Sequence, residues 1–144
     1  MAVKPVPEGY HTITPSFSAK GAAKLIDFLK EAFGAEEAFR MPMPSGEIMH
    51  AELRIGDSVV MVADAIQQPP ATCALFLYVN DVDALYKRAV KAGADSSMAP
   101  ADMFWGDRVA QVKDKFGNSY AIATHKKDVP PQEMQKRAEA AMKQ

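Results

Sequence analysis

The sequence predicts an α+β fold in which two βαβββ modules form a curved mixed sheet around a groove, with an added C-terminal helix. Strand and helix signals come in the same order in both halves of the chain. The segments AFGA (32–35) and KAGA (91–94) each end a predicted helix and lie 59 residues apart. The hairpin segments GDSVVMVAD (56–64) and GNSYAIATH (117–125) lie 61 residues apart. Two matches at nearly one spacing indicate an internal duplication.

The composition indicates one folded domain. The chain has 144 residues, with 48% apolar and 24% charged side chains and a net charge of -1, which excludes disorder or a coiled coil for most of its length. A near-neutral chain lacks the excess of basic residues that is typical of nucleic-acid-binding proteins. No apolar run approaches the roughly 18–20 residues that span a bilayer. The lone Cys73 excludes an internal disulfide, and residues 1–10 lack an apolar signal segment. We therefore expect a cytoplasmic protein with one domain over 1–128 and a C-terminal helix over 129–144.

The first module is expected over about 10–64. Its first strand is predicted at 10–17 (YHTITPSF), where β-branched and aromatic residues alternate. A helix follows from Gly21 and is expected to end at Gly34 in a left-handed cap. Its buried face is indicated by apolar residues at three- and four-residue spacing, which are Ala22, Leu25, Ile26, Leu29 and Phe33.

Three strands complete this module. The first, at 36–41, has the weakest signal, and the turn MPMPSGE follows it. In the strand at 47–55, alternation directs Ile48, His50, Glu52 and Arg54 to the solvent face and Met49, Ala51, Leu53 and Ile55 inward. Gly56 and Asp57 then form a tight turn into the partner strand at 58–63.

The second module is expected over about 73–125, after a linker at 65–72. The apolar run 73–79 predicts a strand, and Asn80 or Asp81 caps the next helix. That helix is expected to have Val82, Leu85, Ala89 and Val90 on its inner face and to close at Gly93. The remaining predictions are a poor strand at 96–98, a loop over 100–106, strands at 107–113 and 118–124, and a terminal helix from Pro130.

Neither module is large enough to be stable alone, but two small sheets side by side enclose a concave site of the kind that binds small ligands. At this level the chain resembles the vicinal oxygen chelate superfamily, also called the glyoxalase/bleomycin resistance/dioxygenase superfamily, and within it the PhnB-like branch. The resemblance rests on segments spread from residue 10 to residue 125, which are YHTITP (10–15), IDFLKEAFGAEE (26–37), IMHAELRIGDSVVMVAD (48–64), FWGDR (104–108) and KDKFGNSYAIATH (113–125).

Metal-dependent members of this superfamily place four ligands on the groove, two from each module. The resemblance puts the first ligand at His11. It puts the other three at Val60 or Met61, at Cys73 or Ala74, and at Ala121. Neither of the expected glutamates is present, so the resemblance implies no glyoxalase I-type metal centre and no cofactor.

The loop around Trp105 is the most informative candidate for ligand binding. It gathers the only tryptophan, a second aromatic residue and an Asp/Arg pair where the chain enters a strand. Aromatic walls with a fixed charge suit a small planar or anionic ligand, whereas packed aromatics and a local ion pair are the structural alternative. The candidate ligand-binding residues are His11, Tyr78, Phe104, Trp105, Asp107 and Arg108.

Two functional hypotheses remain open. The first is a protein that binds a small molecule in the groove without a metal ion or any chemistry. The second is a lyase, isomerase or dioxygenase that uses a rearranged metal site from His11, His50 and Glu52, or a metal-free acid/base pair. The solvent face of a strand is the plainer interpretation of His50 and Glu52, and a surface terminus is that of His125. The resemblance also implies a homodimer. Apolar residues at helical spacing predict that the terminal helix packs on the body or on a second subunit.

Overall fold

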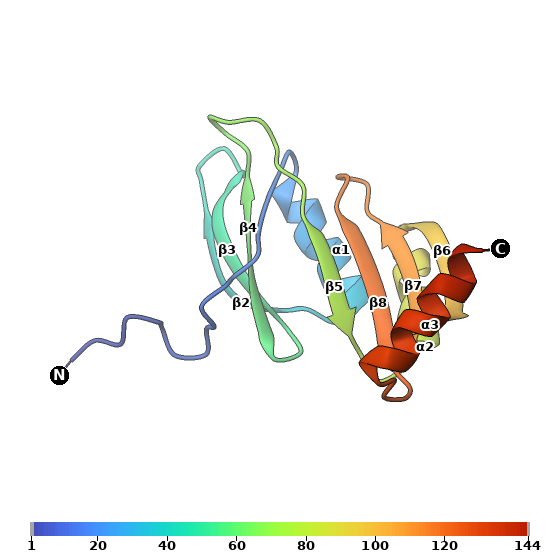
Figure 1. The fold of residues 1–144 in the computed structure, drawn as a ribbon. Helices are drawn as coiled ribbons and strands as arrows, with labels where there is room; N and C mark the ends of the chain where they lie inside the picture. Colours follow the sequence, from blue (N-terminus) through green and yellow to red (C-terminus); the bar gives the residue numbers. More distant parts are fainter. Residues whose placement is uncertain (1, 144) are drawn as a thin grey trace.

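Two four-stranded mixed sheets, one from each half of the chain, form the frame of the protein (Figure 1). The computed structural model describes residues 2–143. The strand order is β1-β4-β3-β2 in the first sheet and β5-β8-β7-β6 in the second, so the two modules have the same topology. In each sheet the first and last strands of the module pair in parallel, and the other pairs are antiparallel. This arrangement confirms the α+β class and the paired modules.

The elements follow the predicted order with small changes at their ends. They are β1 (Ser16–Ala19), α1 (Ala22–Phe33), β2 (Glu36–Pro42), β3 (Ile48–Ile55), β4 (Ser58–Asp64), β5 (Ala74–Tyr78), α2 (Val82–Lys91), β6 (Asp95–Asp102), β7 (Asp107–Lys113), β8 (Ser119–His125) and α3 (Pro131–Met142).

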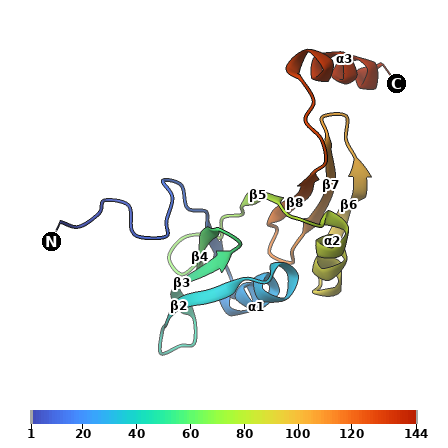
Figure 2. The same ribbon diagram turned by 90° about the horizontal axis from the view of Figure 1, so that it is seen from below.

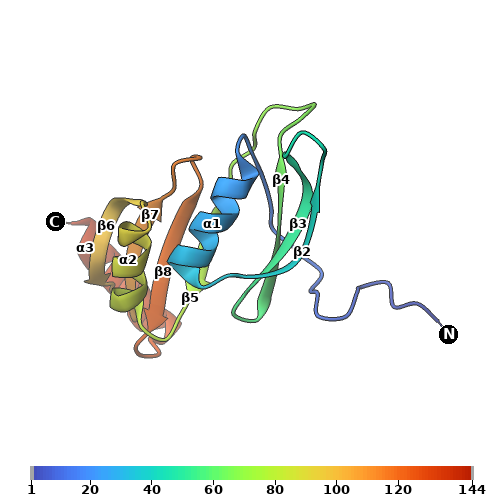
Figure 3. The same cartoon turned by 180° about the vertical axis from the view of Figure 1, so that it is seen from behind.

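One hydrophobic core joins the modules. Helices α1 and α2 contact each other and lie on the same side of the sheets (Figures 1 and 3). The ring of Tyr120 on β8 packs against aromatic rings of the first module, with centroids 4.8 Å from Phe33, 6.1 Å from Phe28 and 6.4 Å from Phe17. Because aromatic side chains bury large apolar areas, this cluster ties the second sheet to α1.

Side chains at the end of each module's last strand cap the start of its helix. In the first module, Asp64 Oδ1 accepts hydrogen bonds from the backbone N–H groups of Gly21 and Ala22 at 2.9 and 3.0 Å. In the second module, Thr124 Oγ1 accepts from the Val82 N–H at 2.9 Å. The predicted cap at Asp81 is also confirmed, since its carboxylate accepts from the Ala84 N–H at 3.1 Å.

The first strand is shorter and later than predicted. It covers Ser16–Ala19, and residues 10–15 precede it as irregular chain. Proline cannot donate to a sheet, and pairing with β4 starts where Met61 N donates to the Pro15 carbonyl. His11 therefore lies outside the sheet and is exposed.

The inward and outward positions of β3 change at its start. Ile48 is buried and Met49 is 51% exposed, opposite to the prediction. The pairing with β2 accounts for this. Met41 pairs with His50 and Pro42 with Ile48, so Met49 is an extra residue in β3 that shifts which side chains face the core. From His50 onward the predicted alternation holds, with Ala51 and Leu53 buried.

Two features of the second module also differ from prediction. Strand β6 runs through Pro100 to Asp102, where a loop was expected. Proline is tolerated there because β6 is an edge strand and its pairing with β7 is irregular between Met98 and Ala101. Val90 is exposed, since the buried stripe of α2 passes through Val82 and Ala89.

The C-terminal helix α3 lies beyond the end of the second sheet, on the side opposite α2 (Figure 2). None of its described residues is buried, and Met134, Arg137 and Ala138 are half-buried. Arg137 donates to the Phe104 carbonyl at 3.1 Å, which fixes the helix against the loop before β7. No helix within residues 2–143 has the length and apolar character needed to cross a membrane.

Candidate functional site

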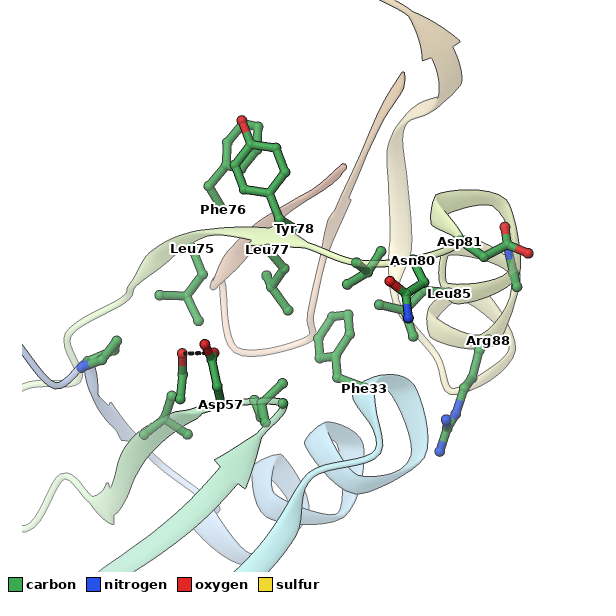
Figure 4. Close-up of a pocket in the computed structure, with 17 residues that line it drawn as sticks. Phe33, Asp57, Leu75, Phe76, Leu77, Tyr78, Asn80, Asp81, Leu85 and Arg88 are labelled. Carbon is green, nitrogen blue, oxygen red and sulfur yellow. Dashed lines mark hydrogen bonds between the residues drawn. The ribbon is translucent and has the colours of Figure 1, made fainter. Parts of the chain in front are cut away.

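A cleft of about 780 Å³ opens where the two modules meet (Figure 4). Its walls come from the end of α1, the β3–β4 turn, strand β5 and the start of α2. The apolar walls consist of Phe33, Ile55, Val60, Leu75, Leu77, Val79 and Leu85. The volume and the apolar lining are those of ordinary small-molecule sites, which occupy about 300–1,000 Å³.

Strand β5 divides this cleft from the opposite face of the second sheet. Leu75 and Leu77 point into the cleft, whereas the rings of Phe76 and Tyr78 point away from it (Figure 4). This follows from the alternation of side chains along a strand. Tyr78 therefore borders the cleft through its backbone and presents its hydroxyl elsewhere.

Polar groups surround the cleft at its rim. The Asp57 carboxylate accepts only a 3.1 Å hydrogen bond from the Ser58 hydroxyl among the contacts of the described chain. The Arg88 guanidinium is already engaged, because it donates to the Glu31 and Lys30 carbonyls at 2.6 and 3.2 Å. The arrangement suits a mainly apolar molecule with a polar end directed to solvent.

A second cluster is centred on the carboxylate of Asp107, which is 2% exposed. Its Oδ2 accepts from the Tyr78 hydroxyl at 2.9 Å and from Trp105 Nε1 at 3.0 Å. Its Oδ1 lies 2.7 Å from Nδ1 of His125. Burial opposes ionisation of Asp107, but the hydrogen bonds from His125, Tyr78 and Trp105 outweigh it and hold its pKa below the ordinary value.

His125 is more than a free surface terminus. Its side chain is 50% exposed, yet its Nδ1 faces Asp107 and its Nε2 faces Asp128 Oδ1, both at 2.7 Å. Hydrogen bonds to Asp128 and then to Asp107 raise the pKa of His125 above the ordinary value. The residue therefore links the buried carboxylate to the chain that leads into α3.

The other predicted ligand-binding residues are dispersed. Arg108 lies on the opposite face of β7 from Asp107 and forms a two-pronged ion pair with Asp83 at 2.8 and 3.0 Å. It also contacts Asp102 at 3.3 Å, and these carboxylates raise its pKa. Phe104 packs edge-on against Trp105 with a centroid distance of 5.0 Å. The structure thus brings Tyr78, Trp105 and Asp107 together with Phe104 beside Trp105, and it leaves His11 and Arg108 outside that cluster.

His50 and Glu52 form a pair of their own. Nε2 of His50 lies 3.4 Å from Oε2 of Glu52, on the face of β3 opposite the buried Ala51 and Leu53. Neither residue is part of the cleft lining, and neither is His11.

The residues present do not fit the four-ligand metal centre of the metal-dependent relatives. Of the ligand positions on the strands, Met61 and Ala121 are partly buried and lack a carboxylate, and the Cys73 thiol donates to the Ser16 carbonyl at 3.1 Å. Within residues 2–143, no group of three or more His, Cys, Asp or Glu side chains is arranged to hold a metal ion.

Sequence reasoning did not identify the lining of the cleft. The sequence predicts Phe33 on the buried face of the first helix, and Leu75 and Leu77 within an apolar strand. Such residues have the same apolar signal in a core and in a pocket. The β3–β4 turn with Asp57 gave a turn signal only, and its position next to β5 depends on how the modules dock.

Comparison with known proteins identifies the family. Residues 11–122 match the family model of the Glyoxalase/Bleomycin resistance protein/Dioxygenase superfamily. The chain belongs to this superfamily. An uncharacterized protein of Mycobacterium tuberculosis is 36% identical over 137 residues, covering 85% of this chain and 79% of the relative. An uncharacterized protein of Mycobacterium bovis has the same identity and covers 85% of this chain and 89% of the relative.

Solved structures agree with this assignment. TioX from Micromonospora sp. ML1 superposes with a TM-score of 0.70 at 26% identity, covering 80% of this chain and 98% of TioX. The fosfomycin resistance protein FosX from Mesorhizobium loti has a TM-score of 0.60 at 16% identity, covering 79% of this chain and 91% of FosX. At 16% identity the second likeness shows the shared superfamily fold alone.

Proposed function

We propose that this chain binds a small, mainly apolar organic molecule in the cleft between its modules and does so without a metal ion. The observation that carries the proposal is the cleft of about 780 Å³, whose apolar walls come from both modules. The mismatch with the four-ligand centre supports binding without a metal.

The test uses N-phenyl-1-naphthylamine, an uncharged apolar fluorophore that brightens when it leaves water. We expect saturable binding to the wild-type protein with one molecule per chain. Leu77→Trp fills the cleft from β5 and should weaken binding at least tenfold, about 1.4 kcal/mol in binding free energy. Ile66→Ala changes an exposed residue of the linker between the modules that does not line the cleft, and should leave the affinity unchanged.

Two outcomes would contradict this proposal. If Leu77→Trp binds the fluorophore as tightly as wild type, the cleft is not its site. Binding that is lost when EDTA is added, together with a stoichiometric divalent metal in elemental analysis, would overturn the metal-free proposal. Matching circular dichroism spectra for the variants show that the comparison concerns folded protein.

We also propose the finer parts of the assignment, namely the PhnB-like branch, a cytoplasmic location and a homodimer. The sequence motifs around FWGDR (104–108) support the branch, and the lone Cys73 suits a reducing compartment. Exposed apolar side chains on both sheets support a second copy, among them Phe39 at 44% and Phe76 at 53% exposure. Light scattering that gives the mass of a monomer at micromolar concentration would contradict the homodimer.

A further inference from the structure

The charged groups at the rim of the cleft are not equally available to a ligand. Among the residues that line the cleft, the charged side chains are those of Asp57, Asp81 and Arg88. The remaining polar side chains there, Ser58 and Asn80, are neutral. The charge that a ligand carries at its polar end therefore depends on which of the three charged groups is free to meet it.

The positive charge at the rim is already offset. Arg88 lies at the end of the cleft away from Asp57 (Figure 4), and its guanidinium donates to the Glu31 and Lys30 carbonyls at 2.6 and 3.2 Å. These carbonyls belong to the last turn of α1, where a helix carries partial negative charge. Arg88 therefore stabilises the end of α1 and adds little attraction for an anionic ligand.

The start of α2, at the same edge of the cleft, also disfavours an anion. Backbone N–H groups at a helix N-terminus attract anions when they are free. Here the Val82 N–H donates to Thr124 Oγ1 at 2.9 Å, and the Ala84 N–H donates to Asp81 Oδ1 at 3.1 Å. Asp83 adds a second carboxylate in the first turn of this helix. An anionic group would therefore meet like charge at this edge.

Asp57 is the charged group that remains available. Its carboxylate points from the β3–β4 turn toward the apolar wall that Leu75 and Leu77 form (Figure 4). Within residues 2–143 it has one hydrogen bond, which the Ser58 hydroxyl donates at 3.1 Å. An ionised carboxylate only accepts hydrogen bonds, and it accepts most strongly from cationic donors. An apolar body in the cleft would bring its polar end to this carboxylate.

We propose that the ligand of the cleft is an apolar amine, protonated at neutral pH. Its ammonium group donates to the Asp57 carboxylate, and its hydrocarbon body packs against Leu77 and Phe33. This inference rests on the proposed function, because it assigns the ligand class of the same cleft. Asp57 is exposed, so water and salt screen the ion pair and its effect on affinity is modest.

The experiment compares three probes that share a naphthalene ring and differ at the polar end. They are 2-(1-naphthyl)ethylamine, 2-(1-naphthyl)ethanol and 1-naphthylacetate, and each displaces bound N-phenyl-1-naphthylamine at neutral pH and low ionic strength. We expect the amine to bind about threefold more tightly than the alcohol, and the carboxylate about threefold more weakly. The three affinities should converge in about 0.5 M NaCl, because salt screens charges at the rim.

Three variants locate the charge that selects the amine. Asp57→Asn keeps the size of the side chain and should make the amine and the alcohol bind equally. Asp81→Asn keeps the helix cap, and its carboxylate points away from the cleft (Figure 4), so it should reduce the preference less than Asp57→Asn. The matched control Asp27→Asn removes the same charge from an exposed position of α1 outside the cleft lining and should keep the full preference.

The outcomes separate this inference from the proposed function. Equal binding of amine and alcohol to the wild-type protein, tighter binding of the carboxylate, or an amine preference that survives Asp57→Asn would overturn the ligand class alone. A larger loss with Asp81→Asn than with Asp57→Asn would also overturn it, because the ammonium would then lie at α2. Failure of N-phenyl-1-naphthylamine to bind would overturn the proposed function and the ligand class together.

Discussion

Gly106 occupies a position that no other residue can fill without moving the chain. It has φ of +103°, a left-handed conformation that side chains rarely adopt. A Cβ atom there would overlap the backbone carbonyl of Lys127. The Gly106 carbonyl accepts from the N–H groups of Lys126 and Lys127 at 2.9 and 3.1 Å, so this residue sets how the C-terminal segment crosses the loop before β7.

We therefore predict that Gly106→Ala lowers the free energy of unfolding by about 2–4 kcal/mol, through backbone strain and the steric overlap together. The matched control is Gly46→Ala. Gly46 has φ of +93° but no atom within 4 Å of its added Cβ, so this change should cost only about 1 kcal/mol. Urea denaturation measures both values. Equal costs at the two positions would show that the contact with Lys127 is unimportant.

Asp64 joins three parts of the first module. Besides capping α1, it accepts from the Ile48 N–H through Oδ2 at 2.6 Å. Burial opposes its ionisation, but the backbone N–H groups of Ala22, Ile48 and Gly21 outweigh burial and keep its pKa below the ordinary value. A carboxylate with a depressed pKa stabilises the fold above its unfolded pKa of about 4, and this stability is lost as the pH falls through the folded pKa.

Asp64→Asn should accordingly cost about 1–2 kcal/mol of stability at pH 7, because an amide cannot accept at both oxygen positions. The deficit should shrink as the pH falls from about 4 toward the lower pKa of the folded carboxylate, because Asp64 of the unfolded wild-type chain takes up its proton first. Asp57→Asn, in an exposed turn, should match wild type throughout. If the free energies of unfolding of wild type and Asp64→Asn differ by the same amount at every pH from 7 to 3, ionisation of Asp64 does not stabilise the fold as proposed.

At the scale of elements, α1 belongs to the first module by sequence and to both modules by packing. Its last residue, Phe33, is 7% exposed, and its ring is in contact with Tyr120 of β8. Phe33 also lines the cleft, where it lies opposite Leu75 and Leu77 (Figure 4). The helix thus holds the two sheets at the separation that leaves the cleft open.

Phe33→Ala should lower the free energy of unfolding by about 3–5 kcal/mol through the cavity that it creates. The unfolding transition should remain single, because the modules share one core. Phe76→Ala removes a ring that is 53% exposed and should cost much less, about 1 kcal/mol or below. Two separate transitions in calorimetry of Phe33→Ala would show that the modules fold independently.

For the whole molecule, the duplication was predictable because both modules have the same order of helix caps and turns, which are local features of the sequence. Gly34 ends α1, Asp81 caps α2 and the Gly56–Asp57 turn joins β3 to β4 as expected. The cleft was not predictable, since it depends on the docking of modules through apolar residues that resemble any core. The Asp107 cluster was only partly predictable. Tyr78 and Trp105 were candidates, but the hydrogen bond to His125 joins positions 18 residues apart.

The most direct test of the central claim is an amide NMR titration with N-phenyl-1-naphthylamine, because the claim is that both modules form one metal-free ligand cleft. We predict shift changes in both modules, at 55–58 near the β3–β4 turn and at 75–85 along β5 and the start of α2. The same changes should occur in the presence of EDTA. Shift changes confined to one module, or absent once EDTA is added, would contradict the claim.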